Sequence, residues 1–139
     1  MKVKNMMHRG VEFVEPTATV AAIAKKMRDH DIGAIPVCEK GKAIGMVTDR
    51  DIAIRALANG RDVAMLTARD VMTPKIAYCR DSEEAEDAIR IMENRQIRRL
   101  PVLDDADRLV GMLSLGDVAH AMAQELAGEM TKAVSAHHA

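Results

Sequence analysis

The sequence predicts an α/β fold in which two similar β-α-β-β-α units pack together about a pseudo-twofold axis. The first observation behind this prediction is an internal duplication, since the stretch that begins at Met7 recurs 65 positions later at Met72. This period exceeds the roughly 20–50 residues of helical and propeller repeats, so the chain holds a doubled domain. The identical pairs at this offset are Met7/Met72, Met27/Met92, Ile32/Ile97, Pro36/Pro101 and Val37/Val102.

The second observation is that the duplication slips only once. One extra residue within 104–107 moves the offset to 66, after which Gly45/Gly111 and Asp51/Asp117 match again. A slip in a turn leaves the flanking elements intact, so both copies should share one fold and face each other across paired clefts. The expected organisation is a first repeat at 6–60, a packed connector at 61–70, a second repeat at 71–127 and a flexible C-terminal tail at 128–139.

Each copy reads as strand, helix, strand, strand, helix. Period-two alternation and short apolar runs indicate the strands, and apolar residues three and four apart indicate the helices. Thr17 or Thr19 can cap the first helix. In the first copy the elements are expected at 11–14, from Val20, at 34–38, at 43–47 and from Thr48 to Asn59. In the second they are expected at 75–79, after a cap at 81–84, at 100–103, at 109–113 and from Ser114 toward Met130.

Composition excludes several classes of function. The formal net charge is −1 and aromatic residues make up 1% of the chain, so neither a general positive field nor a stacking platform supports nucleic-acid binding. No apolar run is long enough to span a membrane, and no signal peptide is visible. We therefore expect a cytoplasmic protein in which Cys38 and Cys79 are free thiols, with no functional metal site.

The residues that could bind a ligand lie at the junction between each predicted hairpin and the helix that follows it. The segments 45–51 and 111–117 share the pattern Gly-x-apolar-Thr/Ser-x-x-Asp. A hydroxyl at a helix start can bind a phosphate oxygen, and an aspartate one turn later can accept both hydroxyl protons of a ribose. The alternative is structural, because Thr or Ser at the N-cap and Asp at the third position also form an ordinary helix cap. Duplication does not separate the two interpretations.

Apolar residues before Pro-Val, a hairpin, the Gly-x-apolar-Thr/Ser-x-x-Asp pattern and a helix occur in both copies. This repeated pattern resembles a tandem pair of CBS domains, the Bateman module, over about residues 6–125. The segment Thr-Asp-Arg-Asp at 48–51 is similar to the first motif of stand-alone bacterial two-CBS proteins, some of them linked to stress or hypoxia. The resemblance implies binding of AMP, ADP or ATP, and in some members NAD or S-adenosylmethionine, in two clefts between the repeats.

The resemblance also implies site residues. In the first cleft Asp51 would hold the ribose, Thr48 and Arg50 would face a phosphate, and Ser82 would add a polar contact. Arg98 and Arg99 would bind phosphates, which suits the bidentate guanidinium.

In the second cleft Asp117 and Ser114 would take the ribose and phosphate roles, with Thr17 opposite them. The backbone of Gly33 and Ala34 would stand where Arg98 and Arg99 stand in the other copy, so the second cleft would lack the arginine pair. Val37 and Val102 would line the base pockets.

Together these observations predict a non-catalytic regulatory sensor that binds an adenine nucleotide as a regulatory ligand, with no cofactor. No nucleophile, base and orienting group stand together in the sequence. The resemblance implies a homodimer, with an unknown effector protein as a further partner. Two alternatives stay open: a ligand-independent interaction module, and a redox- or metal-responsive stress protein that uses Cys38, Cys79, His137 and His138.

Overall fold

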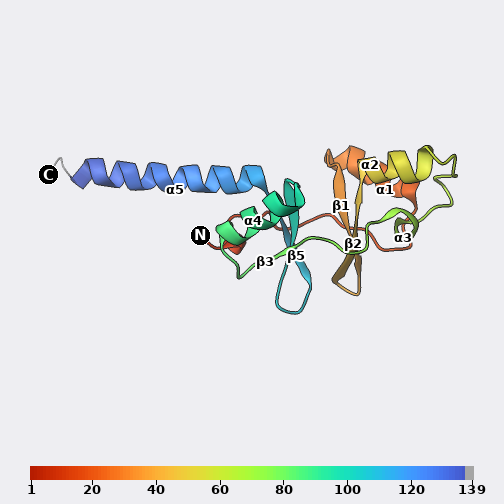
Figure 1. Ribbon diagram of the computed structural model, residues 1–139, viewed down its shortest axis with the longest axis horizontal. Coiled ribbons are helices and arrows are strands. Elements are labelled where there is room, and N and C mark those ends of the chain that lie inside the picture. The colour runs from red at the N-terminus through yellow and green to blue at the C-terminus, as the bar shows by residue number, and fades with distance from the viewer. Residues whose placement is uncertain (137–139) are drawn as a thin grey trace.

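The computed structural model, which describes residues 1–136, places two antiparallel hairpins at the centre of the molecule (Figure 1). The first hairpin pairs β1 (Ala34–Glu39) with β2 (Lys42–Thr48), and the second pairs β4 (Arg99–Leu103) with β5 (Leu109–Ser114). Their turns also meet, because Leu109 N–H donates to the Gly41 carbonyl at 3.3 Å. Both predicted hairpins are therefore confirmed.

The strand expected at the start of each repeat is much shorter than the sequence predicts. No strand forms at 11–14; Val14 alone makes a parallel bridge to Val37. In the second repeat, β3 (Cys79–Arg80) replaces the strand expected at 75–79 and pairs in parallel with β4. Val14 makes two backbone hydrogen bonds, of 3.0 and 2.9 Å, to Pro36 and Cys38. One residue is therefore enough to pair with this edge of β1. The predicted order of elements is kept, but the first strand is reduced to a single bridge.

The first helix of each repeat begins close to where the sequence predicts it. Helix α1 (Val20–His30) is capped by Thr19, whose side chain accepts from the Ala22 N–H at 3.1 Å. Helix α4 (Ala85–Arg95) is capped by Glu84, the last residue of the expected cap at 81–84. Both helices end in the left-handed conformation, at Asp31 and Gln96. These equivalent caps follow from the duplication.

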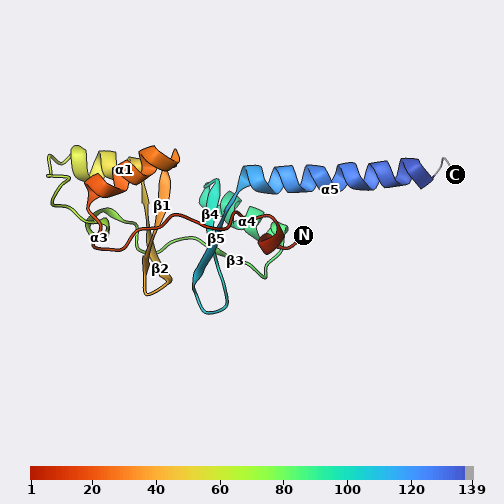
Figure 2. The same cartoon turned by 180° about the vertical axis from the view of Figure 1, so that it is seen from behind.

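The second helix of each repeat differs from its partner. After Thr48 the chain forms α2 (Asp49–Asp51), which continues as the π-helical segment η2 (Ile52–Leu57). The equivalent helix α5 (Leu115–Ala136) is a single straight element that projects from the body (Figures 1 and 2). Residues 128–136, expected as a flexible tail, continue this helix instead; 137–139 lie outside the described residues. Within residues 1–136, no helix is long and apolar enough to cross a membrane.

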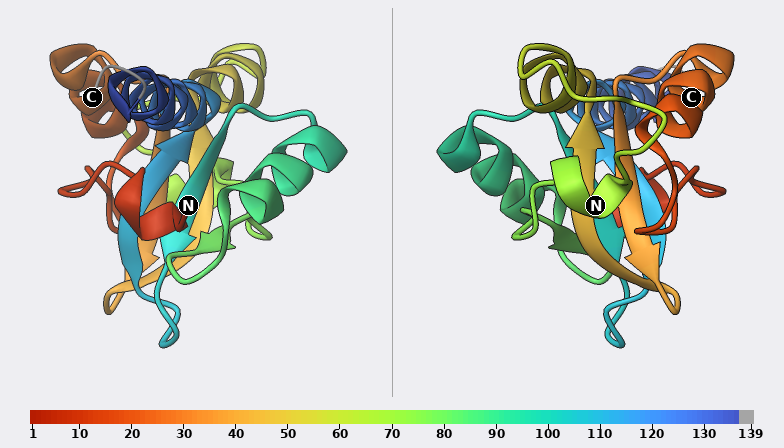
Figure 3. Two further views of the ribbon diagram at one scale, coloured as in Figure 1. Left: turned by 90° about the vertical axis from the view of Figure 1, so that its left-hand side faces the viewer. Right: turned by 90° about the vertical axis from the view of Figure 1, so that its right-hand side faces the viewer.

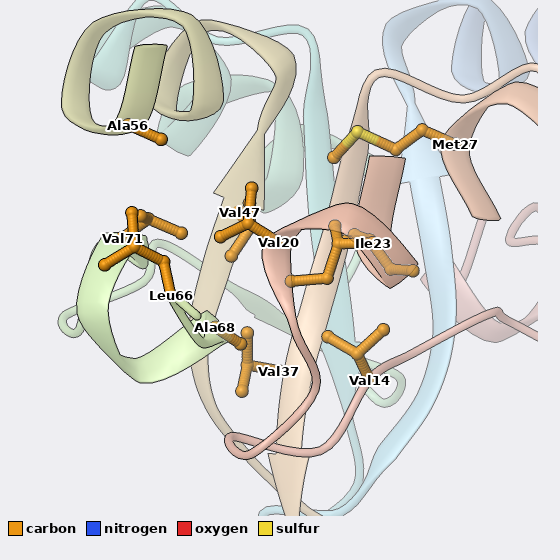
Figure 4. Close-up of a cluster of buried hydrophobic side chains, with 11 residues drawn as sticks. Val14, Val20, Ile23, Met27, Val37, Val47, Ala56, Leu66, Ala68 and Val71 are labelled. Atoms are coloured by element: carbon orange, nitrogen blue, oxygen red, sulfur yellow. The ribbon is translucent and has the colours of Figure 1, made fainter. Parts of the chain in front are cut away.

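The two hydrophobic cores do not coincide with the two halves of the sequence. The first core combines residues of α1, β1 and β2 with Leu66, Ala68 and Val71, from the segment that leads into the second repeat (Figure 4). Ala68 and Val71 lie in the short helix α3 (Ala68–Val71). The second core takes in Val3 and Met6 from the N-terminus, where η1 (Val3–Asn5) lies near α4 (Figure 3). Each core is thus completed by the segment that leads into the other repeat.

Two glycines allow these exchanged segments to cross the hairpins. A Cβ atom at Gly45 would lie 2.5 Å from the Met72 sulfur and 3.0 Å from the Thr73 carbonyl oxygen. At Gly111 it would lie 2.6 Å from the Met7 sulfur and 2.8 Å from the carbonyl oxygen of His8. Backbone cannot move aside as a side chain can, so only glycine fits at either crossing. The repeated glycine of the motif therefore has a packing role.

Candidate functional site

The hydroxyl and carboxylate of each repeat form a reciprocal helix cap. Asp51 N–H donates to Thr48 Oγ1 at 3.1 Å, and Thr48 N–H donates to Asp51 Oδ2 at 2.9 Å. Ser114 and Asp117 make the same pair of bonds, both 2.9 Å long. The capping interpretation is therefore confirmed in both copies. The cap leaves part of the hydrogen-bonding capacity of these groups unused, since each hydroxyl only accepts here and can still donate its own proton.

The second oxygen of each aspartate is held differently. Asp51 Oδ1 has only Arg55 Nε at 3.9 Å, beyond hydrogen-bonding distance. Asp117 Oδ1 lies 2.8 Å from His8 Nε2. Both carboxylate side chains are 16% exposed. Asp51 therefore offers an open acceptor to a ligand, whereas at Asp117 a ligand must share with His8 or displace it.

The first cleft encloses about 470 Å³, and Thr48 and Asp51 lie in its lining. Most of its charged groups come from the second repeat. Four are cationic and one, Asp51, is acidic. The cationic residues are Lys75, Arg95, Arg98 and Arg99. The volume lies in the range of small-molecule sites, which usually measure about 300–1,000 Å³, and the charge favours an anion.

The second cleft encloses about 390 Å³ and contains Ser114 and Asp117. Its charge is more balanced, because Arg9 and Arg99 face Glu12 and Asp117. Two histidines, His8 and His30, also lie in the lining. The prediction that the two clefts are not equivalent agrees with this difference in lining.

Three residues, Ala34, Arg99 and Met112, line both clefts. The expectation that Arg98 and Arg99 both serve the first cleft alone is wrong for Arg99. Arg99 pairs with Ser114 across β4 and β5, which places Arg99 beside the second cleft as well. Arg98 lines only the first.

Several predicted residues lie elsewhere. Val37 and Val102 are 0% exposed and belong to the two cores, so they cannot line base pockets. Strand side chains alternate between faces, and the preceding prolines, Pro36 and Pro101, line the clefts instead. The remaining residues, Thr17, Gly33, Arg50 and Ser82, lie outside both linings.

Each of these four has another place in the structure. Thr17 lines a separate groove along α1. The Gly33 carbonyl accepts the Asp49 N–H at 2.9 Å, which ties the end of the first loop to α2. Arg50 is exposed on α2, and the Ser82 carbonyl accepts from Lys2 Nζ at 3.1 Å, beside the N-terminus.

Sequence reasoning missed several lining residues. Lys75 and Arg95 reach the first cleft from positions outside the repeated motif. His8 and Arg9 reach the second from the start of the first repeat, ahead of the strand expected at 11–14. Ile32 and Ile97 could have been predicted from the sequence, because they form an identical pair in the duplication. Each of them lines one cleft.

The cysteines are free, as the sequence predicts, but they are poorly placed for redox or metal chemistry. Burial raises the pKa of the Cys38 thiol to about 11 and that of Cys79 to about 12, with smaller contributions from Glu15 and Glu83. A protonated, buried thiol is a poor nucleophile and a poor metal ligand. These two residues therefore give little support to the redox alternative.

Two repeats, each presenting a capped hydroxyl and carboxylate to a cleft between them, define a duplicated α/β module. The chain belongs to the CBS domain family: its residues 3–57 and 68–124 both match the CBS domain. The matches place the chain among regulatory CBS-domain pairs and indicate no catalytic family.

Relatives of similar length share this organisation. The CBS domain-containing protein YhcV of Bacillus subtilis is 41% identical over 134 residues, covering 96% of this chain and 94% of the relative. Hypoxic response protein 1 of Mycobacterium tuberculosis is 36% identical over 132 residues, covering 94% and 92%.

Solved structures with the same fold hold different ligands. Hypoxic Response Protein I, with two coordinated zinc ions, superposes with a TM-score of 0.80 at 37% identity, covering 87% of this chain and 98% of that one. CBSX2 in complex with AMP superposes with a TM-score of 0.78 at 27% sequence identity, covering 88% of this chain and 96% of that one. The CBS pair of MJ0100, in complex with 5′-methylthioadenosine and S-adenosyl-L-methionine, superposes with a TM-score of 0.77 at 25% sequence identity. The match covers 90% of this chain and 98% of that one.

The described part of this chain has no group of side chains that could bind zinc, the metal held by Hypoxic Response Protein I. Among residues 1–136, no three or more His, Cys, Asp or Glu side chains are grouped to hold a metal ion. His137 and His138, named in the metal alternative, lie outside the described residues.

Proposed function

We propose that the chain is a regulatory sensor that binds an adenine nucleotide in the first cleft, and more weakly in the second. The observation that carries this proposal is the lining of the first cleft, where four cations surround one hydroxyl–carboxylate pair. Neighbours with the same fold hold AMP, 5′-methylthioadenosine and S-adenosyl-L-methionine. Their shared adenosine moiety fits a site with a carboxylate for the ribose.

The charge of the first cleft narrows the choice of ligand. S-adenosylmethionine carries a sulfonium cation, which would meet four cationic side chains and a single carboxylate. AMP, ADP and ATP carry phosphates that can accept charge-assisted hydrogen bonds from guanidinium groups. We therefore propose a phosphorylated adenosine ligand for the first cleft.

Each residue has a distinct role in this proposal. Asp51 would accept the ribose hydroxyls through its open Oδ1, while its Oδ2 maintains the helix cap. Thr48 would donate its hydroxyl proton to a phosphate oxygen. Arg95 and Arg98 would bind the outer phosphates, because a planar guanidinium can donate two parallel hydrogen bonds to one phosphate.

Calorimetric titration with AMP and ATP tests the proposal. We expect micromolar affinity, about −8 kcal/mol. Asp51→Ala should weaken the first cleft by about 1.5–3 kcal/mol, the range for a hydrogen bond to a charged group. Loss of the acid at the helix start should cost only about 0.3–1 kcal/mol of stability, so the variant should stay folded.

Asp70→Ala is the matched control for this substitution. Asp70 forms the same kind of cap with Thr67, whose N–H donates to Asp70 Oδ2 at 2.9 Å, but it lies outside both clefts. Its replacement should lower stability by a similar amount and leave nucleotide binding intact. Equal binding by both variants would identify Asp51 as a structural cap only, and no heat with any nucleotide at millimolar concentration would overturn the proposed function.

We further propose that the sensor is a homodimer in a reducing cytosol, consistent with its two free thiols. The support for a dimer is an exposed apolar stripe on α5, where Leu126, Met130 and Val134 are 58%, 61% and 59% exposed. These residues lie beyond 124, where the CBS match ends, and recur every four positions along one helix face. A second copy can cover such a stripe with its own.

Replacing Leu126 and Met130 by glutamine should convert the dimer to a monomer, as measured by light scattering. Gln124→Ala, on α5 but outside the apolar stripe, should leave the mass unchanged. A monomeric parent protein at micromolar concentration would contradict the proposed dimer.

A further inference from the structure

The beginning of β4 lies between the two clefts. Ala34 and Arg99 begin the equivalent strands β1 and β4, and both residues line both clefts. The first repeat therefore contributes only a methyl group at the position where the second contributes a guanidinium. Among residues 1–136, Arg99 is the only charged residue that lines both clefts.

The Arg99 side chain is free to move. It is exposed, and it makes no hydrogen bond or ion pair within residues 1–136, whereas Arg55 and Arg80 both donate to backbone carbonyls. A long side chain without a partner can turn toward either cleft at little cost. Its neighbours differ on the two sides, since Arg98 adds a second guanidinium in the first cleft only.

We infer that Arg99 couples the two clefts negatively, because a phosphate bound in one cleft withdraws this guanidinium from the other. The inference rests on the proposed function and adds a regulatory property to the same site. A guanidinium binds one phosphate through two parallel hydrogen bonds, and that geometry turns its planar fork away from a second anion. Any such coupling is reciprocal, so occupancy of either cleft must weaken the other by the same factor.

This coupling would make the response to nucleotide graded. The first cleft, with its additional cations, would fill at low concentration. The second would fill only at a higher concentration, after Arg99 had been committed to the first. The sensor would then distinguish two concentration ranges of one ligand with a single chain.

Isolated clefts are needed to measure the coupling. Ile97 lines only the first cleft and Ile32 only the second, and the two are equivalent in the duplication. Ile97→Trp and Ile32→Trp should therefore each fill one cleft and leave the other open. In calorimetric titrations with AMP, we expect the second binding step of the parent protein to be about 5- to 150-fold weaker than binding to the second cleft alone, the usual range of coupling.

Two arginine variants assign the coupling to Arg99. Arg99→Ala should weaken both isolated clefts and remove the difference between isolated and sequential binding. Arg98→Ala, the matched control, should weaken the first cleft and preserve the difference. Adenosine, which has no phosphate, should bind each cleft of the parent protein as tightly as it binds the same cleft isolated by a tryptophan variant.

The outcomes separate this inference from the proposed function. If no adenine nucleotide binds, the proposed function fails. If AMP binds both clefts but independently, or if adenosine shows the same coupling as AMP, only the shared role of Arg99 is overturned. A coupling that grows in Arg99→Ala would point to direct repulsion between two phosphates and would also overturn it.

Discussion

Replacing Arg95 and Arg98 together by alanine is expected to lower the affinity of the first cleft for ATP by about 3–6 kcal/mol, at least about a hundredfold. Each charge-assisted hydrogen bond to phosphate contributes about 1.5–3 kcal/mol. The two residues line only the first cleft, so the second should keep its affinity. Titration in the Ile32→Trp background isolates the affected cleft.

The preference among ligands should change with the affinity. The parent first cleft should favour ATP over AMP and adenosine, whereas the double variant should lose most of this preference and keep only the phosphate contacts of Thr48, Lys75 and Arg99. In the parent protein, once Arg99 is held by a phosphate in the first cleft, the second cleft should discriminate little between adenosine and AMP. Arg9→Ala, which alters only the second cleft, is the matched control and should leave the first cleft's preference for ATP unchanged. Equal affinities for adenosine and ATP in the parent first cleft would refute the assignment of phosphate binding to these arginines.

Leu100→Ala is expected to lower the free energy of unfolding by about 2–5 kcal/mol, the range for a buried leucine truncated to alanine. Leu100 is 0% exposed and belongs to the second core, next to the lining residues Arg99 and Pro101. The loss combines the apolar contacts of the missing atoms with the cavity that they leave. Urea denaturation measures it as a shift of the midpoint at constant slope.

Met65→Ala provides the surface control, because Met65 is 77% exposed and should change stability by less than about 0.5 kcal/mol. If Leu100→Ala were equally mild, the second core would not be packed as the structure shows. A smaller dependence of the free energy of unfolding on urea concentration, together with a small shift of the urea midpoint, would instead indicate that unfolding is no longer two-state.

Local rules were sufficient for the elements that carry the motif. The hairpins at 34–48 and 99–114 follow from short apolar runs separated by turn residues, and α1 follows from Thr19 and its apolar spacing. The capping geometry of Thr48 and Asp51 could also be predicted, because a cap involves residues only three apart. These features depend on contacts that are near in sequence.

Predictions that depended on which face of a strand lines a cleft were less successful. Val37 and Val102 were expected in the base pockets, but they lie in the cores, while the adjacent prolines face the clefts. A shift of one residue exchanges the two faces of a strand, and both faces here are covered by apolar groups. Hydrophobic patterning alone could not choose between them.

The sequence by itself determined that this protein is a duplicated α/β module with a capped hydroxyl–carboxylate pair in each half, because a repeat and its caps are local features. Only the tertiary structure decided how the halves are completed. Val3 enters the second core, Val71 enters the first, and Arg99 lines both clefts. The close crossings at Gly45 and Gly111 bring these segments together. Contacts between residues so far apart depend on how two whole surfaces fit, and a linear pattern of residue types does not record that fit.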